Sequence, residues 1–404
     1  MTSNIFLYLH RLLYLFLHYI ILFIIPIYIY KITGISSYLG IVFTIEWGVR
    51  LLSLSIVPTF FTFKNNIRIM QRTNIIQGLS TLLLLLCYIT TNNIIFLIII
   101  GVISSIFFDI NYLSIENYIQ NNIGTNQLLK IQSNIQAIEQ TSMILSPFLA
   151  GMLIDHINST HLISALGVCL TLIPIFLLFQ QENQINVLTP PNKINYSIHE
   201  VNQTITKGIK IIASVPEALN LIILTNSINL IYGATLALLP AIILGHYNQS
   251  ATFLGNFNFV ISIISVISIL VFNRLITLSQ YKSNSIMYIL LLITSISVLC
   301  GILQYNLNEL KYTLILLGII ILADSIFSIG LRTKRQLIFN NEQFKVVLPC
   351  MMLLNAIAFP LGGIFVSLFT IQFNEPTTLL LISICTILLS VSLYIIKLTF
   401  ERKK

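Results

Sequence analysis

Long apolar runs separated by short polar stretches repeat along the whole chain. A helix that crosses a membrane needs roughly 20 apolar residues. Twelve runs of this kind predict twelve membrane-spanning helices, at 8–30, 36–60, 72–91, 94–118, 130–154, 161–179, 217–243, 251–273, 284–304, 311–331, 345–370 and 377–397. The first run is too long for a cleavable signal peptide and no small-residue cleavage site follows it, so we expect it to remain as the first helix.

The pattern changes between the sixth and seventh runs. Residues 180–215 are rich in Gln, Asn and Pro and form the only long polar segment. We therefore predict a six-helix bundle over 1–180, a cytoplasmic central loop over 181–215 and a second six-helix bundle over 216–404. Residues 201–213 alternate apolar and polar positions, which predicts a short helix at the membrane interface.

The composition is typical of a polytopic all-α membrane protein. Of the 404 residues, 56% are hydrophobic and 8% are charged, and the mean hydropathy is +0.91. A soluble domain carries about 25% charged residues, so a soluble enzyme, a nucleic-acid-binding module and a secreted scaffold are excluded. The five cysteines lie singly inside apolar runs, which indicates membrane-core residues rather than disulfides or a metal site.

The basic residues predict the orientation of the chain. Of the 21 Lys and Arg, 17 lie in the loops of one side or in the C-terminal tail, and positively charged loops stay in the cytoplasm. The opposite loops hold only Lys31 and Lys311, and Arg11 and Arg50 lie within helices. We therefore expect a multi-pass inner-membrane protein with both termini in the cytoplasm, which requires an even number of spans.

Ionisable side chains inside the predicted spans are the main functional candidates. Each costs several kcal/mol near the bilayer centre and normally faces the protein interior or a wet cavity. The third, sixth, ninth and twelfth runs carry no charge in their cores, which predicts that these four helices face lipid while the others surround an aqueous path. The candidates lie in the first, second, fourth, fifth and tenth runs: Arg11, His18, Glu46, Arg50, Asp109, Glu116, Glu139 and Asp324.

Structural explanations stay open for several candidates. Glu46 and Arg50 are four residues apart on one helix face, so they either neutralise each other or act in a cavity. Arg11 and Glu116 are close enough to the cytoplasmic end to reach water by snorkelling.

Asp109 and Glu139 have no basic residue one turn away in their own helices. Each is therefore either protonated or paired across helices, and a buried carboxyl without a partner can act as a reversible proton carrier. Asp324 is followed by Arg332, but eight residues is a long reach for a pair within one helix. A lone histidine such as His18 is weak evidence for function.

The sequence indicates no other chemistry. It has no G-x-x-x-x-G-K-[ST] phosphate loop, no H-E-x-x-H zinc motif and no G-x-S-x-G nucleophile motif. We therefore expect no enzyme activity, no direct use of ATP and no cofactor or metal. Either hinges or static kinks are expected at the helix positions Pro147, Gly151, Pro240, Pro360, Gly362 and Gly363.

The twelve spans, the long central loop and the uncharged every-third helices resemble the major facilitator superfamily over essentially the whole chain. The resemblance implies two six-helix halves that rock around a central cavity. Residues 146–151 read Ser-Pro-Phe-Leu-Ala-Gly and resemble the family's antiporter motif Gly-Pro-x-x-Gly-Gly. The stretches 11–36 and 332–344 are similar to efflux members related to siderophore exporters.

The loop after the second run departs from the family pattern Gly-x-x-x-Asp-Arg-x-Gly-Arg-Arg. Pro58 stands at the glycine position and Thr62 at the acid position, so only basic character remains. We expect a weaker or differently built cytoplasmic charge lock. The residues that the resemblance implies for gating are Lys64, Arg68, Pro147 and Gly151.

The resemblance implies a monomeric secondary transporter that exports a small organic solute, such as a siderophore, in exchange for protons. The alternative is proton-coupled uptake of a nutrient or an iron–siderophore complex, and a third hypothesis is a protein of this fold that scaffolds a complex or senses a ligand. The implied site residues are Arg11, Glu46 and Arg50 for substrate binding and Asp109, Glu139 and Asp324 for proton coupling.

Overall fold

The protein is helical throughout the part that the computed structural model describes. That part comprises residues 5–60, 65–122, 125–179, 198–278, 309–311, 314–315, 317–321, 338–339 and 341–401. Its contacts define two compact units: the first is Met1–Thr33, Glu46–Ile198 and Gln249–Phe259, and the second is Gly34–Ile45, His199–Asn248 and Val260–Lys404. Helices α2 (Ser36–Phe60) and α9 (Ala251–Leu278) each contribute residues to both units.

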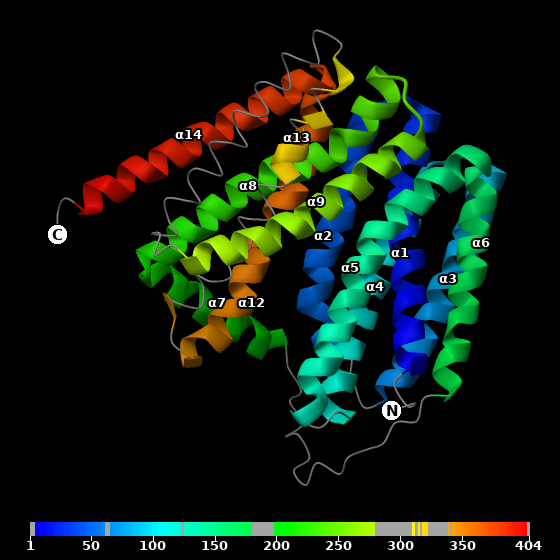
Figure 1. The fold of residues 1–404 in the computed structure, drawn as a ribbon, viewed down its shortest axis with the longest axis horizontal. Coiled ribbons are helices and arrows are strands. Elements are labelled where there is room, and N and C mark those ends of the chain that lie inside the picture. The colour runs from blue at the N-terminus through cyan, green and yellow to red at the C-terminus, as the bar shows by residue number, and fades with distance from the viewer. Residues whose placement is uncertain are drawn as a thin grey trace. The chain divides into compact units, whose positions relative to one another are not determined.

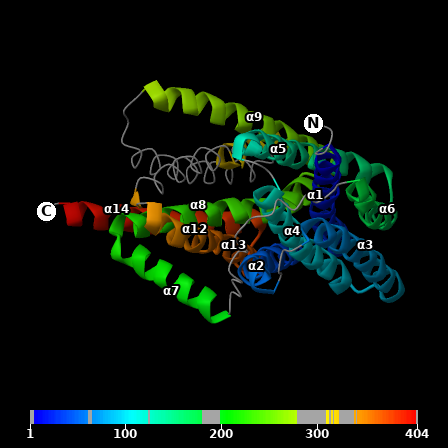
Figure 2. The ribbon, with the colours of Figure 1, turned by 90° about the horizontal axis from the view of Figure 1, so that it is seen from below.

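The first unit is built around α1, which is apolar over most of its length but buries His10, Arg11 and His18. Helices α4, α5 and α6 and the short 3₁₀ segment η2 pack against it, and α3 packs against α4, α6 and η2 (Figures 1 and 2). The bounds are α1 Ile5–Thr33, α3 Asn66–Thr91, α4 Ile95–Asn122, α5 Thr125–His156, α6 Ser159–Leu172 and η2 Ile173–Phe179.

An apolar cluster holds these helices together near the start of α1. Its members come from α1, α3, α4, α5 and η2, so it fixes the spacing of the helices on which the polar site lies. The buried side chains are Leu7, Ile67, Met70, Ile115, Tyr118, Ile119, Ile131, Ile135 and Leu177. Arg11 follows Leu7 by one helical turn and therefore begins the polar region directly above this cluster.

In the second unit, α8 packs against α12, α13 and α14. The bounds are α7 Ile198–Ser214, α8 Pro216–Pro240, the π-helical turn η3 Ala241–His246, α12 Asn341–Ala356, α13 Ala358–Phe369 and α14 Glu375–Glu401. The short helix predicted over 201–213 is confirmed as α7.

The helix predicted over 345–370 is two helices, separated at Ile357. Pro360 lies in the first turn of α13, where a helix does not need the backbone N–H that proline lacks. A continuous helix would instead need that N–H to bond to Ala356, and the ring would clash there. The break at Ile357 therefore explains how Pro360 is accommodated.

The all-α membrane fold is confirmed. In the described part, seven helices are long and apolar enough to cross a membrane: Ile5–Thr33, Asn66–Thr91, Ile95–Ile119, Asn134–His156, Ser159–Leu178, Pro216–His246 and Cys350–Phe369. The predicted run 284–304 and most of the run 311–331 lie outside the described residues. The number of twelve spans and the boundaries of the two halves and the central loop therefore stay predictions.

Helices α3 and α6 meet through glycines. A Cβ on Gly78 would lie 2.5 Å from Thr171 Cγ2 and 2.6 Å from the Gly167 carbonyl oxygen, so only a glycine allows this close approach. The outward faces of both helices carry exposed aliphatic side chains, as lipid-facing helices require: Ile76, Leu79, Leu83, Leu86, Val168 and Leu172.

We expect Gly78→Leu to destabilise the protein by about 1–3 kcal/mol, because the larger side chain overpacks the α3–α6 contact. Gly48→Ala in α2 is the matched control, since a Cβ there meets nothing within 4 Å. The free energy of unfolding, measured by SDS titration of the protein in detergent micelles, checks this. Equal stability of the two variants would contradict the tight contact.

Candidate functional site

Arg11 and Glu139 form an ion pair between α1 and α5. The Arg11 Nη2 atom lies 2.5 Å from Glu139 Oε1, and the Arg11 side chain is 0% exposed whereas that of Glu139 is 26% exposed. A buried charge is tolerated only with a partner, so Glu139 offsets the cost of burying Arg11. The snorkelling interpretation of Arg11 is therefore wrong, and Glu139 is paired across helices.

Two asparagines extend this pair into a chain of hydrogen bonds. Arg11 Nη1 donates to Asn111 Oδ1 on α4 at 3.4 Å, and Asn111 Nδ2 donates to Asn74 Oδ1 on α3 at 2.9 Å. Asn74 Nδ2 lies 2.7 Å from Nε2 of His10, back on α1. Both asparagines and His10 are buried, so four helices are joined by one internal polar chain.

Sequence reasoning missed Asn74 and Asn111. The core of α3 carries no charged residue, yet its buried polar residues Thr73, Asn74, Gln77 and Thr81 recur at spacings of three and four. That spacing places them on one helix face, and it is the signal that identifies α3 as part of the site.

A second ion pair joins α2 and α4. Arg50 Nε lies 3.9 Å from Asp109 Oδ1, and Ser53 donates a hydrogen bond to the other carboxylate oxygen of Asp109. The Arg50 guanidinium also lies over the rings of Trp47, at 4.8 Å, and Phe108, at 5.0 Å. Arg50 therefore forms its ion pair with Asp109, across helices, rather than with Glu46 one turn away.

Aromatic rings connect the two ion pairs. His10, Tyr14 and His18 are spaced four residues apart on α1, and their rings stack with centroids 6.2 and 6.1 Å apart. His18 then stacks on Phe108 at 4.5 Å, the same ring that lies under Arg50. His18 is 1% exposed, so the structure brings this histidine into the site.

The remaining predicted site residues have different positions. Glu46 is 9% exposed, and its Oε1 atom lies against Gly101, where an added Cβ would be 2.5 Å from it. Arg68 is exposed on α3, away from the buried polar residues of that helix. Asp324 and Lys64 lie outside the described residues.

The C-terminal part of α5 packs closely on the start of α9. A Cβ on Gly151 would lie 2.5 Å from the Ala251 carbonyl oxygen, and a Cβ on Gly255 would lie 2.5 Å from the Pro147 carbonyl oxygen. The small residues of the stretch 146–151 therefore bring α5 and α9 into backbone contact. Pro147 and Gly151, predicted to gate, lie at this contact.

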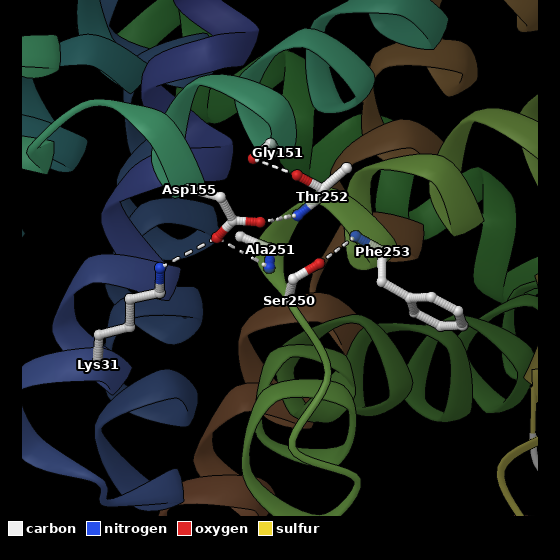
Figure 3. Close-up of polar contacts among 7 residues, drawn as sticks. All are labelled: Lys31, Gly151, Asp155, Ser250, Ala251, Thr252 and Phe253. Carbon is white, nitrogen blue, oxygen red and sulfur yellow. Dashed lines mark hydrogen bonds and ion pairs between the residues drawn. The ribbon is translucent and has the colours of Figure 1, made fainter.

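Asp155, one turn beyond Gly151, binds the N-terminus of α9 (Figure 3). Its carboxylate accepts hydrogen bonds from the backbone N–H of Thr252 at 2.7 Å and of Ala251 at 3.3 Å. Lys31, at the end of α1, contacts the same carboxylate at 3.5 Å. A negative charge at a helix N-terminus is stabilising because it bonds the free N–H groups and complements the helix dipole.

A comparable close contact joins α2 and α13 in the second unit, where a Cβ on Gly363 would lie 2.7 Å from the Gly40 carbonyl oxygen. Ser36 Oγ donates to Glu375 Oε1 at 2.5 Å nearby.

Asp155 follows the predicted span 130–154 and lies at the end of α5. Its carboxylate is held by the hydrogen bonds from the backbone N–H groups of Thr252 and Ala251 and by the ion pair with Lys31. No sequence pattern marks this residue, because the N–H groups that it binds are backbone atoms.

No group that could hold a metal ion is found among the residues that the structure describes: no three His, Cys, Asp or Glu side chains gather at one point there. The chemistry available in the first unit is that of two cations, Arg11 and Arg50, each facing a carboxylate, with neutral amides and histidines between them. Such an arrangement can bind an anion and exchange protons.

No protein-family model and no curated protein sequence matches the chain. Solved structures match it over nearly its whole length. A bacterial homologue of the iron transporter ferroportin, in an inward-facing state, has a TM-score of 0.72 at 15% identity and covers 97% of this chain and 98% of its own.

Two further structures are similar. A bacterial homologue of the human lysosomal transporter Spinster, inward-facing and occupied, has a TM-score of 0.74 at 10% identity, covering 100% of this chain and 98% of its own. A POT family transporter in complex with 5-aminolevulinic acid has a TM-score of 0.69 at 12% identity, covering 98% and 96%. The chain therefore has the fold of the major facilitator superfamily transporters, and identities this low show the fold alone.

We expect Glu139→Gln to destabilise the protein by about 3–5 kcal/mol, because it leaves the fully buried Arg11 without a counter-charge. The double variant Arg11→Met with Glu139→Leu removes both charges and is expected to recover most of that loss. Unfolding in detergent micelles measures both. A double variant as unstable as Glu139→Gln would contradict the role of the pair.

Proposed function

We propose that this protein is a proton-coupled secondary transporter for a small, carboxylate-bearing organic solute. In the proposed arrangement it lies in the inner membrane as a monomer with both termini in the cytoplasm. The fold supports this proposal, because the solved structures described above are all transporters. The distribution of basic loops supports the orientation.

The observation that carries the proposal is the unequal exposure of the Arg50–Asp109 pair. The Arg50 side chain is 26% exposed and Asp109 is 2% exposed, so the cation is the accessible partner. In the described part of the chain, Arg50 Nε makes no hydrogen bond, because its contact with Asp109 is an ion pair at 3.9 Å. A guanidinium matches a carboxylate, which can bind it through two parallel hydrogen bonds.

Solute and proton binding are coupled at this pair. A solute carboxylate that binds Arg50 competes with Asp109 for the guanidinium. Asp109 is then a buried carboxyl without a counter-charge, and it takes up a proton rather than remain charged. The solute and the proton consequently bind together, which is the requirement for symport, and an inward proton gradient drives uptake by this route.

Export of a siderophore in exchange for protons is the second candidate function. The stretch 146–151, which resembles the antiporter motif, favours it, since its small residues form the α5–α9 contact. Export of the solute in exchange for protons requires that the proton and the solute do not bind at the same time. Glu139, which is 26% exposed, is then the carboxyl with access to water for the proton.

Deletion of the gene identifies both the solute and the direction. Medium and cell extract of the deletion strain and its parent, grown under iron limitation, are compared by mass spectrometry. A carboxylate-bearing chelator that is lost from the medium and accumulates inside establishes export. A solute that stays in the medium and is depleted inside establishes uptake.

We expect Arg50→Gln to weaken transport of that solute about 10- to 100-fold. A hydrogen bond to a charged group contributes roughly 1.5–3 kcal/mol, and 1.4 kcal/mol corresponds to about tenfold in affinity. Asp109→Asn is expected to retain solute binding and to lose the dependence on the pH gradient. Uptake into proteoliposomes measures both, with Arg72→Gln, at an exposed position of α3, as the control.

Unchanged transport in both Arg50→Gln and Asp109→Asn would overturn the proposed site. No transport phenotype on deletion of the gene would favour the hypothesis of a protein that scaffolds a complex or senses a ligand.

The α5–α9 contact is the proposed gate on the side opposite the basic loops. Alternating access requires a contact that closes the cavity and that can open again. Asp155 supplies hydrogen bonds that are lost when the start of α9 moves away, and Pro147 and Gly151 supply the close approach. Lys64 and Arg68 are the proposed gating residues on the cytoplasmic side.

We expect Asp155→Asn to speed amide hydrogen exchange at residues 251–255 by about tenfold or more, because it weakens charge-assisted hydrogen bonds worth roughly 1.5–3 kcal/mol. Lys31→Met is expected to have a smaller effect, since an exposed ion pair contributes about 0–1 kcal/mol. Exchange detected by mass spectrometry measures both variants.

The exchanged pair, Lys31→Asp with Asp155→Lys, separates the two interactions. It restores an ion pair but places a cation at the N-terminus of α9, so we expect it to exchange as fast as Asp155→Asn. Wild-type protection in the exchanged pair would show that the ion pair, rather than the bonds to α9, closes the contact.

A further inference from the structure

The hydrogen-bond chain from Arg11 to His10 has a fixed direction. The Arg11 guanidinium only donates, so the Asn111 atom that faces it is the carbonyl oxygen. The amide group of Asn111 then faces Asn74, which must accept with its own carbonyl oxygen. Asn74 consequently presents its amide group to Nε2 of His10, and that nitrogen must accept.

His10 is therefore neutral in this state, with its proton on Nδ1. That nitrogen is buried and has no hydrogen-bond partner among the described residues. A buried donor without a partner costs free energy, so this tautomer is imposed by the chain rather than by the surroundings of Nδ1.

A proton on Nε2 of His10 conflicts with the same chain. Protonated His10 would donate at Nε2 and would face the amide group of Asn74, which also donates. This conflict is removed only if the side-chain amides of both Asn74 and Asn111 rotate by half a turn, which exchanges the positions of their oxygen and nitrogen atoms. The amide group of Asn111 would then face Arg11, and Arg11 would lose an acceptor. Protonation of His10 and the Arg11–Asn111 bond thus exclude each other.

The groups around His10 come from every helix that packs against this part of α1. Arg11 and Tyr14 lie on α1 itself, Asn74 and Gln77 on α3, and Asn111 and Tyr112 on α4. Glu139 on α5 lies beyond Arg11. The described ranges of α6 and η2 contain one titratable histidine, the exposed His161, so Arg11 is the cation that opposes a charge on His10.

We infer that His10 is a further proton-binding residue of the transport cycle, linked through Asn74 and Asn111 to the position of Arg11. This inference rests on the proposed proton-coupled function. When Arg11 is held by Asn111 and Glu139, His10 stays neutral. When Arg11 leaves Asn111, both amides are free to rotate and His10 takes a proton from water that reaches the site. Asn74 and Asn111 are positioning residues that transmit the change.

The first test reads the tautomer directly and needs no transport. The nitrogen NMR shifts of His10 are measured in the full-length protein in lipid nanodiscs, with His10→Gln to assign the signal. Wild type is expected to show an unprotonated Nε2. In Asn74→Asp we expect both ring nitrogens of His10 to be protonated. The aspartate can accept hydrogen bonds from His10 and from Asn111 at once, so the bond between Asn111 and Arg11 is kept.

The second test is the pH dependence of transport in proteoliposomes. His10→Gln keeps an acceptor for Asn74 but binds no proton. The slope of the logarithm of the transport rate against pH is therefore expected to change by about one unit, which corresponds to the loss of one proton. Tyr14→Phe is the matched control. It keeps the ring that stacks on His10, removes only the bond to Gln77, and is expected to retain the wild-type slope.

A protonated Nε2 in the wild type, or an unchanged His10 spectrum in Asn74→Asp, would overturn the inference whether or not the protein transports. A wild-type pH slope in His10→Gln would overturn it as well. Failure of the proposed function is a separate result, seen as unchanged transport in Arg50→Gln and Asp109→Asn.

Discussion

The structure of the first unit depends on the cost of placing a charge where water is absent. Arg11 is 0% exposed on α1, so it requires a carboxylate and further acceptors. These come from three other helices: Glu139 on α5, Asn111 on α4 and, through Asn111, Asn74 on α3. One buried cation therefore sets where four helices meet.

The two cations differ in what their surroundings allow. Arg11 is buried and bonded through its two terminal nitrogens to Asn111 and Glu139, which suits a residue whose position depends on its neighbours. Arg50 is 26% exposed, lies over the rings of Trp47 and Phe108 and is paired with Asp109, which suits a residue that receives a ligand. The stacked rings of His10, Tyr14, His18 and Phe108 join these two environments through α1 and α4.

The α5–α9 and α2–α13 contacts differ from these buried ion pairs, because small residues and backbone atoms form them. Gly151 and Gly255 bring the backbones of α5 and α9 together beside the ring contact of Phe148 with Phe259, and Gly40 and Gly363 bring the backbones of α2 and α13 together. Polar contacts at the ends of these helices, from Asp155 and from Ser36 with Glu375, add hydrogen bonds that water can replace. Such surfaces can separate at a lower cost than an interdigitated core.

The sequence alone determined the membrane class, the all-helical fold and most helix positions, because a helix in lipid needs about 20 apolar residues wherever it is placed. It also marked Arg11, Arg50, Asp109 and Glu139, since charges in such runs are rare. Only the tertiary structure decided the pairing, because Arg11 and Glu139 are 128 positions apart. The same holds for Asn74, Asn111 and Asp155, whose roles come from atoms on other helices that no local pattern records.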